Sequence, residues 1–405
     1  MTATRVDHPR PAVQRATATS QRLDYLDSLR GIAALCVVTC HFVAAYGLPG
    51  HPWLWTRTPL HIVWDGPAAV SFFFVLSGMV LSFRHFRTTS SPNLEGFHFA
   101  GYAVSRICRI WLPYLVILGL SVLVFGLSAN GLKTDPPGTP LFHAFWRTDP
   151  TLRSLLRQGF DARFLLPSDG TDALVPQSWS LRVELVMSLL LPLAVIAAGR
   201  STAWLLLCTF LATHLGRVNG YCFHFAVGIV LAKHFRDVVA WLEPRPALRV
   251  LLVFCGWFLA SFDSMAWHVE PFQSLNLGPD LQALGAALLI VVAASSPGVR
   301  SWLSRGLIHH IGKISFSLYL SHMIILICVT PRMMSAMPGA SPLLTWCAGL
   351  AFTAVASLLI SDPLYRIVEL PTIALGKRLS AFVGSQRLST ALSAAERQTV
   401  ATLPS

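Results

Sequence analysis

The chain has few charged residues for its length. Only 12% of its 405 residues are Asp, Glu, Lys or Arg, whereas 54% are hydrophobic. A soluble domain normally carries about a quarter charged residues, so the composition excludes an ordinary soluble protein. The apolar residues form long runs such as "WLPYLVILGLSVLVFGL" at 111–127, and runs of roughly 20 apolar residues match a bilayer core. The sequence therefore predicts an all-α polytopic membrane protein.

Other features are also missing. The first 21 residues are polar and lack the apolar core of a secretory signal. We find no internal repeat of the kind that marks many transporters. Nearly all of the eight cysteines fall within apolar runs, which argues against a disulfide framework. No second cluster has metal-ligand spacing, so we interpret cysteine here as a small apolar residue and predict no metal site.

Ten apolar segments are candidate transmembrane helices. The four between residues 202 and 294 are shorter than the others. Boundaries predicted in this way are uncertain by several residues. The segments are 29–48, 67–83, 111–128, 180–198, 202–215, 221–232, 250–262, 281–294, 315–329 and 343–360.

Basic residues predict the orientation. Ten spans put both termini on one side, and most Lys and Arg residues then fall on that side, which the positive-inside rule makes cytoplasmic. The long segment 130–177 would face outward. The net charge of +12 is spread among loops, so it favours contact with anionic lipid over binding of nucleic acid. Polar tails at 1–22 and 372–405 would flank one transmembrane domain at 23–371.

Arg30 and His41 are separated by ten mostly apolar residues. In a helix this spacing is about three turns, so both side chains share a face with Ala34 and Val37. Ionisable groups within a bilayer normally face a bundle interior or a wet cavity, and they mark function. A functional His41 is favoured, and a histidine that only packs against a neighbouring helix is the alternative. Asp27, three residues before Arg30, can pair with it.

Two further spacings concern the second and third spans. Ser77 and Gly78 are small enough to permit close helix approach. Arg106 and Arg109 lie three residues apart, hence on one side of a helix. Two guanidinium groups there can bind a phosphate or pyrophosphate through paired hydrogen bonds. Ordinary positive-inside anchoring explains this pair equally well.

Polar residues also enter the fourth and ninth spans. Glu184 lies about one turn inside the fourth span and needs a partner in the bilayer. Arg182 is two residues away and points to another side of the helix. Ser315, Tyr319 and His322 have offsets of four and seven and form a polar stripe. This stripe can line a cavity or serve packing alone.

Taken in order, these segments resemble the acyltransferase-3 family of bacterial integral membrane acyltransferases. The resemblance covers about 23–371, and the matching pieces are "LDSLRGIAALCVVTCH", "FFFVLSGMVLSF", "SRICRIWLPY", "QSWSLRVEL", "GKISFSLYLSH" and "VELP". Members of that family transfer an acyl group, usually acetyl from cytoplasmic acyl-coenzyme A (acyl-CoA). The usual acceptor is a hydroxyl on a sugar of lipopolysaccharide, exopolysaccharide or peptidoglycan, or on an antibiotic.

The resemblance implies roles for particular residues. The family's pattern of a basic residue, ten residues and a histidine falls on Arg30 and His41. Its paired-arginine motif and its tryptophan–glutamate motif fall on Arg106, Arg109, Trp179 and Glu184. One departure is that "LVMSLLLP" follows the glutamate, where the family often has an aromatic pair.

The implied chemistry is acyl transfer from a thioester to a hydroxyl. His41 would be the general base, Arg30 would orient the donor with Asp27 holding it, and the arginine pair would bind the coenzyme phosphates. The pantetheine arm is expected to lie over Ala34 and Val37. Glu184 would orient His41 or the acceptor, while Trp179, Ser315, Tyr319 and His322 would support or line the site.

The expected setting is the bacterial cytoplasmic (inner) membrane, with acyl-CoA as co-substrate and no bound cofactor. The expected partners are the lipid bilayer and a carbohydrate or glycolipid acceptor, and a homo-oligomer is left open. The main alternative is a transporter or flippase for a glycan or lipid-linked intermediate, although no repeat supports it. A receptor or scaffold would give no reason for an arginine and a histidine on one intramembrane face.

Overall fold

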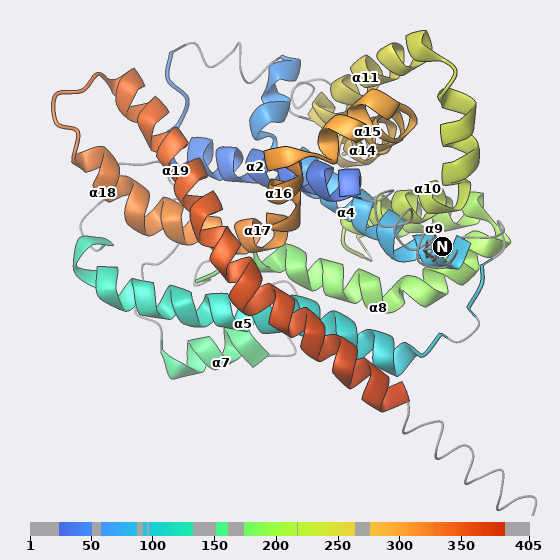
Figure 1. Cartoon of the computed structure of the whole chain (residues 1–405), viewed down its shortest axis with the longest axis horizontal. Helices are drawn as coiled ribbons and strands as arrows, with labels where there is room; N and C mark the ends of the chain where they lie inside the picture. The colour runs from blue at the N-terminus through green and yellow to red at the C-terminus, as the bar shows by residue number, and fades with distance from the viewer. Residues whose placement is uncertain are drawn as a thin grey trace, which may run out of the picture.

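The computed structural model describes residues 24–50, 58–86, 92–94, 97–132, 151–160, 174–216, 218–263 and 276–384. Within these ranges every regular element is a helix, which confirms the all-α prediction (Figure 1). The elements are α2 (Asp24–Tyr46), η1 (Pro59–Trp64), α4 (Gly66–Ser82), η2 (Phe83–Phe86), α5 (Phe99–Leu132), α7 (Leu152–Phe160), α8 (Ser178–Arg200), α9 (Thr202–His214), α10 (Tyr221–Leu242), α11 (Pro246–Ala260), α14 (Gly278–Ser295), α15 (Pro297–Leu303), α16 (Gly306–Lys313), α17 (Ser315–Ile324), η4 (Ile325–Val329), α18 (Thr330–Ser335), α19 (Pro342–Leu364) and η5 (Tyr365–Glu369).

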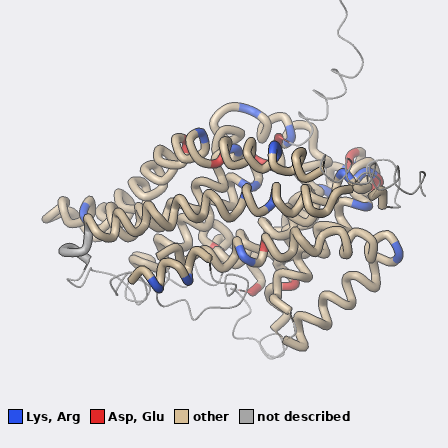
Figure 2. Tube along the Cα trace, turned by 90° about the horizontal axis from the view of Figure 1, so that it is seen from below, with Lys and Arg blue, Asp and Glu red and all other residues tan. Residues whose placement is uncertain are grey.

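Seven helical stretches in the described part are long and apolar enough to cross a membrane. In Figure 2 the helices carry charged residues at few positions along their length. Two shorter apolar helices, α9 and α11, coincide with two of the short predicted segments. The count of ten spans and the side of the termini stay predictions. The seven stretches are Asp24–Tyr46, Gly66–Phe86, Phe99–Leu127, Ser178–Arg200, Gly278–Ser295, Ser315–Ser335 and Pro342–Gly384.

The described residues include only part of the predicted outer segment and of the predicted tails. Helix α7 belongs to the outer segment and is fixed to α5, where Trp111 Nε1 and the Tyr114 hydroxyl donate to the carbonyl oxygens of Gly159 and Gln158. The last long helical stretch continues through Gly384, beyond the predicted domain boundary at 371. The predicted N-terminal tail 1–22 and the end of the C-terminal tail from 385 onward lie outside the described residues.

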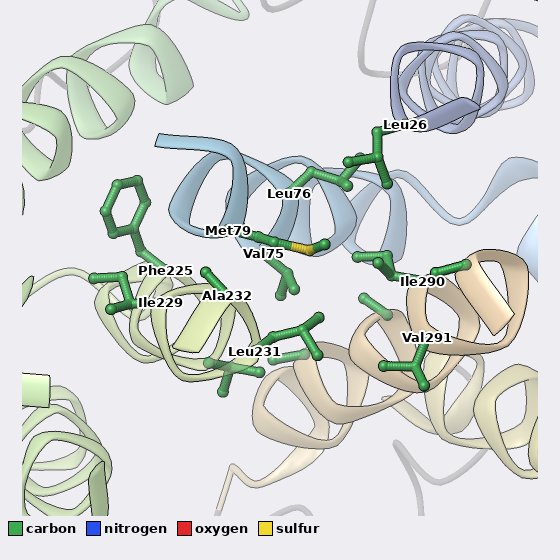
Figure 3. Packing of buried hydrophobic residues seen from close by; sticks show 14 of the residues in the cluster. Leu26, Val75, Leu76, Met79, Phe225, Ile229, Leu231, Ala232, Ile290 and Val291 are labelled. Carbon is green, nitrogen blue, oxygen red and sulfur yellow. The ribbon is translucent and has the colours of Figure 1, made fainter. Parts of the chain in front are cut away.

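Helices α4, α10 and α14 enclose the larger apolar core, to which α2 adds Leu26 (Figure 3). A Cβ atom at Gly78 would collide with the carbonyl oxygen of Phe225, and one at Gly228 with that of Val75. Helices α4 and α10 therefore cross in backbone contact. The predicted close approach at Gly78 is confirmed, because only small residues permit it.

Close backbone contacts also gather the charged segments at one end of the helices. A Cβ atom at Gly31 would lie 2.7 Å from the backbone nitrogen of Gly312, so α16 packs directly on the start of α2. A Cβ atom at Gly376 would lie 3.0 Å from Cβ of Cys108, which brings the late part of the α19 stretch beside α5. Arg30, the arginine pair of α5 and the end of η5 are thereby brought into one neighbourhood.

Buried hydroxyl groups join the α17–α18 stretch to α19. The hydroxyls of Ser321 and Ser361 are 3.3 Å apart, and those of Thr330 and Thr353 are 2.8 Å apart. Such hydrogen bonds hold helices together in a bilayer, where apolar contact gives little preference. Both stretches contain a π-helical turn, η4 and η5, and such wide turns are frequent at functional sites.

Candidate active site

A cavity lies among α2, α4, α5, α8 and α17, and its wall changes in character from one part to another. Charged residues from three helices, apolar residues that come mostly from α4, and four hydroxyl-bearing residues line it. The lining residues are Arg30, Arg106, Arg109 and Glu184; Val70, Phe73, Phe74, Val80, Leu81, Ile110, Leu181 and Phe316; and Ser77, Ser180, Ser315 and Tyr319.

Arg106 and Glu184 form a largely buried ion pair across α5 and α8. Nη2 of Arg106 donates to Oε1 of Glu184 at 2.9 Å, and the glutamate side chain is 26% exposed. The Glu184 carboxylate therefore has the partner that was expected for a charged group within the fourth span. This partner is Arg106 and not the neighbouring Arg182. The second predicted phosphate ligand, Arg109, is exposed and lines the same cavity. Nε of Arg106 is buried and has no hydrogen-bond partner among the described residues.

The predicted pairing of Arg30 with Asp27 is present, with Nη1 and Oδ1 3.8 Å apart. A second carboxylate, Glu369 at the end of η5, interacts electrostatically with Arg109 and Arg30. Glu369 is only 4% exposed and accepts a 2.8 Å hydrogen bond from the Ser317 hydroxyl. Guanidinium groups and carboxylates therefore lie together at this end of the cavity. Asp27 pairs with Arg30, and Glu184 pairs with Arg106.

His41 contacts a second histidine instead of a carboxylate. Its Nδ1 lies 3.0 Å from Nε2 of His322, and the two rings stack with centroids 5.1 Å apart. His41 is partly exposed, whereas His322 is fully buried. The expectation that Glu184 orients His41 finds no support, because Glu184 is engaged with Arg106.

The expected channel over Ala34 and Val37 is wrong. These residues are 0% and 1% exposed, and Ala34 packs with Val38 and with Leu318 of α17. Because α17 covers this face of α2, no space for a pantetheine arm remains there. Arg30 lines the cavity and His41 does not, so the open route follows α4.

Tyr319 stands between the cavity and the histidine pair. It lines the cavity, its hydroxyl is 2.6 Å from that of Ser180, and its ring centroid is 6.1 Å from that of His322. Ser315 also lines the cavity. The polar stripe is therefore a cavity wall at its first two positions and a histidine contact at the third.

Trp179 is placed differently from the other predicted residues. Its side chain is 37% exposed and its ring lies 5.5 Å from that of Tyr221, away from the cavity lining. Next to it, Gln177 is buried and its Nε2 donates to the carbonyl oxygens of Tyr319 and Leu320 at 3.2 and 2.7 Å. The start of α8 therefore fixes the position of Tyr319.

The family model of the acyltransferase-3 group, described as an acyltransferase domain, matches residues 23–362. The chain belongs to the acyltransferase-3 family. Comparisons with curated proteins and with solved structures gave no match. Together with the seven apolar helices, membership identifies an integral membrane acyltransferase.

The site of this acyltransferase-3 protein has the parts that acyl transfer requires. Cationic side chains at one end of the cavity can bind an anionic donor, and hydroxyl groups can donate hydrogen bonds to a developing oxyanion. An imidazole lies beside the cavity behind Tyr319. Among the described residues, no group of three or more His, Cys, Asp and Glu side chains has the arrangement of a metal site.

Three polar residues of this acyltransferase-3 site were missed from the sequence. Gln177 and Ser317 are uncharged, and nothing in their spacing points to a role. Glu369 left a signal, since it is the acidic residue of the closing "VELP" piece. Glu184 was selected because a carboxylate within a bilayer needs a partner and marks function. The same argument applies to Glu369.

Proposed function

We propose that this acyltransferase moves an acetyl group from cytoplasmic acetyl-CoA to a hydroxyl of a carbohydrate acceptor, with His41 as general base. A surface polysaccharide or a lipopolysaccharide has the required hydroxyl groups. The observation that supports this proposal most is the cavity itself, in which Arg30, Arg106 and Arg109 line one end and apolar and hydroxyl groups line the rest.

The donor would enter from the arginine end. Its phosphates would contact Arg109, Arg30 and the part of Arg106 that lines the cavity, since guanidinium groups bind phosphate oxygens in a defined geometry. The pantetheine arm would then follow the apolar side of α4, past Phe73 and Phe74. This route replaces the one over the first helix face, and it ends at Tyr319, next to the histidine pair.

In the reaction, the acceptor hydroxyl would give its proton to His41 Nε2 while its oxygen bonds to the thioester carbonyl carbon. The tetrahedral intermediate would carry its negative charge on the former carbonyl oxygen, within reach of a hydroxyl donor such as Tyr319. Its collapse would break the carbon–sulfur bond and release coenzyme A as a thiolate, which takes the proton from His41. The products are the acetyl ester and coenzyme A.

Inside-out vesicles with labelled acetyl-CoA provide the test. Loss of a general base costs about 10²–10⁴-fold in rate, so His41→Gln should reduce transfer by that factor. Glutamine keeps polarity but accepts no proton near neutral pH. His234→Gln, on α10 and outside the described site, is the matched control and should keep the wild-type rate.

Full activity of His41→Gln would refute the proposed role of this histidine. Import of label into vesicles without any ester product would instead favour a transporter. The acceptor is identified by comparing the surface glycans of cells with and without the gene, where the proposal expects one O-acetyl group fewer.

A further inference from the structure

The contact between His41 and His322 also determines which ring nitrogens carry a proton. Nδ1 of His322 lies 2.9 Å from the carbonyl oxygen of Tyr319 and 3.2 Å from that of Leu318. Carbonyl oxygens only accept hydrogen bonds, so Nδ1 of His322 carries a proton. In the neutral ring, Nε2 of His322 then has a lone pair and accepts a hydrogen bond.

This assignment determines the tautomer of the neighbouring ring. Nε2 of His322 faces Nδ1 of His41 at 3.0 Å. With a lone pair on the first nitrogen, the hydrogen bond requires a proton on Nδ1 of His41. Neutral His41 then has its lone pair on Nε2, which is where a general base needs it.

The carbonyl oxygen at the accepting end of this chain of hydrogen bonds is itself held in place. The Tyr319 carbonyl oxygen that accepts from His322 also accepts from Nε2 of Gln177. His322 is 0% exposed, so water does not compete for its ring nitrogens. Its orientation is therefore set by the backbone of α17 and by the start of α8.

We propose that His322 is a positioning residue, which holds His41 in the tautomer with a proton on Nδ1 and the basic lone pair on Nε2. The inference rests on the proposed function, in which His41 is the base. It gives a role to the contact between two histidines 281 positions apart in the chain, in which both ring nitrogens of His322 are engaged.

A buried imidazole suits this role better in a membrane than a carboxylate does. In serine proteases an aspartate orients the histidine and stabilises its protonated form. A carboxylate at a fully buried position within a bilayer is costly without a cation beside it. A neutral imidazole accepts the same hydrogen bond at a lower cost of desolvation, although it offers no charge to the protonated base.

The kinetic test uses His322→Leu and His322→Gln in the full-length enzyme. We expect His322→Leu to lower kcat by about 10- to 100-fold, less than the roughly 10⁴-fold lost when a protease triad loses its orienting aspartate. The KM for acetyl-CoA should change little, because His322 does not line the donor cavity. His322→Gln should recover much of the rate, since its amide oxygen can accept from Nδ1 of His41.

Combination with His41→Gln separates this inference from the proposed function. Residues that act as a unit have effects that do not add, so the double variant His41→Gln/His322→Leu should be no slower than His41→Gln alone. Additive losses, or a fully active His322→Leu, would overturn the positioning role while His41 remains the base. A fully active His41→Gln would overturn the proposed function itself.

A measurement on the unaltered protein tests the tautomer without relying on catalytic rates. Nitrogen NMR of the ¹⁵N-histidine-labelled enzyme distinguishes protonated from unprotonated ring nitrogens, and the signals of His41 are those that disappear in His41→Gln. We expect Nδ1 of His41 to be protonated and Nε2 unprotonated near neutral pH. The opposite tautomer would refute the inference.

Discussion

Arg106 and Arg109 are equivalent by sequence spacing, yet they should respond differently to substitution. Arg106→Ala leaves the Glu184 carboxylate without the guanidinium that lies 2.9 Å away. Breaking a fully buried ion pair costs about 3–5 kcal/mol, and because Glu184 is 26% exposed we expect the lower end, about 3 kcal/mol. Arg109 is exposed and interacts with Glu369 only electrostatically, so Arg109→Ala should cost less, at most about 1 kcal/mol.

Thermal unfolding of the purified protein, with and without acetyl-CoA, measures both effects. A ligand raises stability in proportion to the logarithm of its concentration over Kd. Arg109→Ala should unfold close to the wild-type temperature without ligand and lose most of the stabilisation by acetyl-CoA. Arg106→Ala should unfold at a lower temperature even without ligand.

A double variant identifies the cause of the Arg106 effect. If the cost comes from an unpaired carboxylate, Arg106→Ala combined with Glu184→Gln should be more stable than Arg106→Ala alone. Equal unfolding temperatures for the two single alanine variants, together with an equal loss of the acetyl-CoA effect, would refute this reasoning. The two arginines would then be interchangeable phosphate ligands.

Three further outcomes follow. Gly78→Ala should destabilise the protein by about 1–3 kcal/mol, since the added Cβ meets the α10 backbone. Gly119→Ala, at an exposed site with nothing within 4 Å, should not destabilise it. Equal stability of the two variants in a detergent unfolding assay would contradict the close packing of α4 on α10. Arg109→Lys should restore only part of the acetyl-CoA affinity in a binding assay, because a lysine lacks the paired donors of arginine. A reporter enzyme fused after Ser405 should be active only in the cytoplasm, and one inserted near Asp149 should be active only outside. Both positions lie outside the described residues. A cytoplasmic signal from the Asp149 insertion would exclude ten spans with cytoplasmic termini.

Local spacing predicted those features of the fold and the site that depend on one helix. The pairing of Asp27 with Arg30 is a contact three residues apart, and it follows from helix geometry alone. Runs of apolar residues identified the long helices for the same reason, since each run must satisfy its own backbone in lipid. The burial of Ser315, Tyr319 and His322 does not follow from their period in this way, because nearly every residue of α17 is buried.

Contacts between helices were not accessible in this way. Arg106 meets Glu184 across 78 positions, and His41 meets His322 across 281. The sequence shows that each of these residues is costly in a bilayer, but it does not show how far each helix is rotated or shifted against its neighbours. The channel over the first helix was wrong for this reason, because the spacing of residues on α2 does not show that Leu318 of α17 packs on Ala34.

Pairing also limits which polar groups remain available for chemistry. Glu184 uses a carboxylate oxygen on Arg106, and His322 uses both ring nitrogens on its neighbours, so these atoms are already engaged in the structure. Polar atoms that retain unused hydrogen-bonding capacity in the described part include Nε of Arg106 and, by the tautomer argument, the lone pair on Nε2 of His41. One is a donor suited to a phosphate and the other a base suited to a hydroxyl. Since Nε of Arg106 is fully buried, a phosphate can reach it only if the Arg106 side chain moves. A buried donor left unpaired is expensive, so such a movement on donor binding would be favoured.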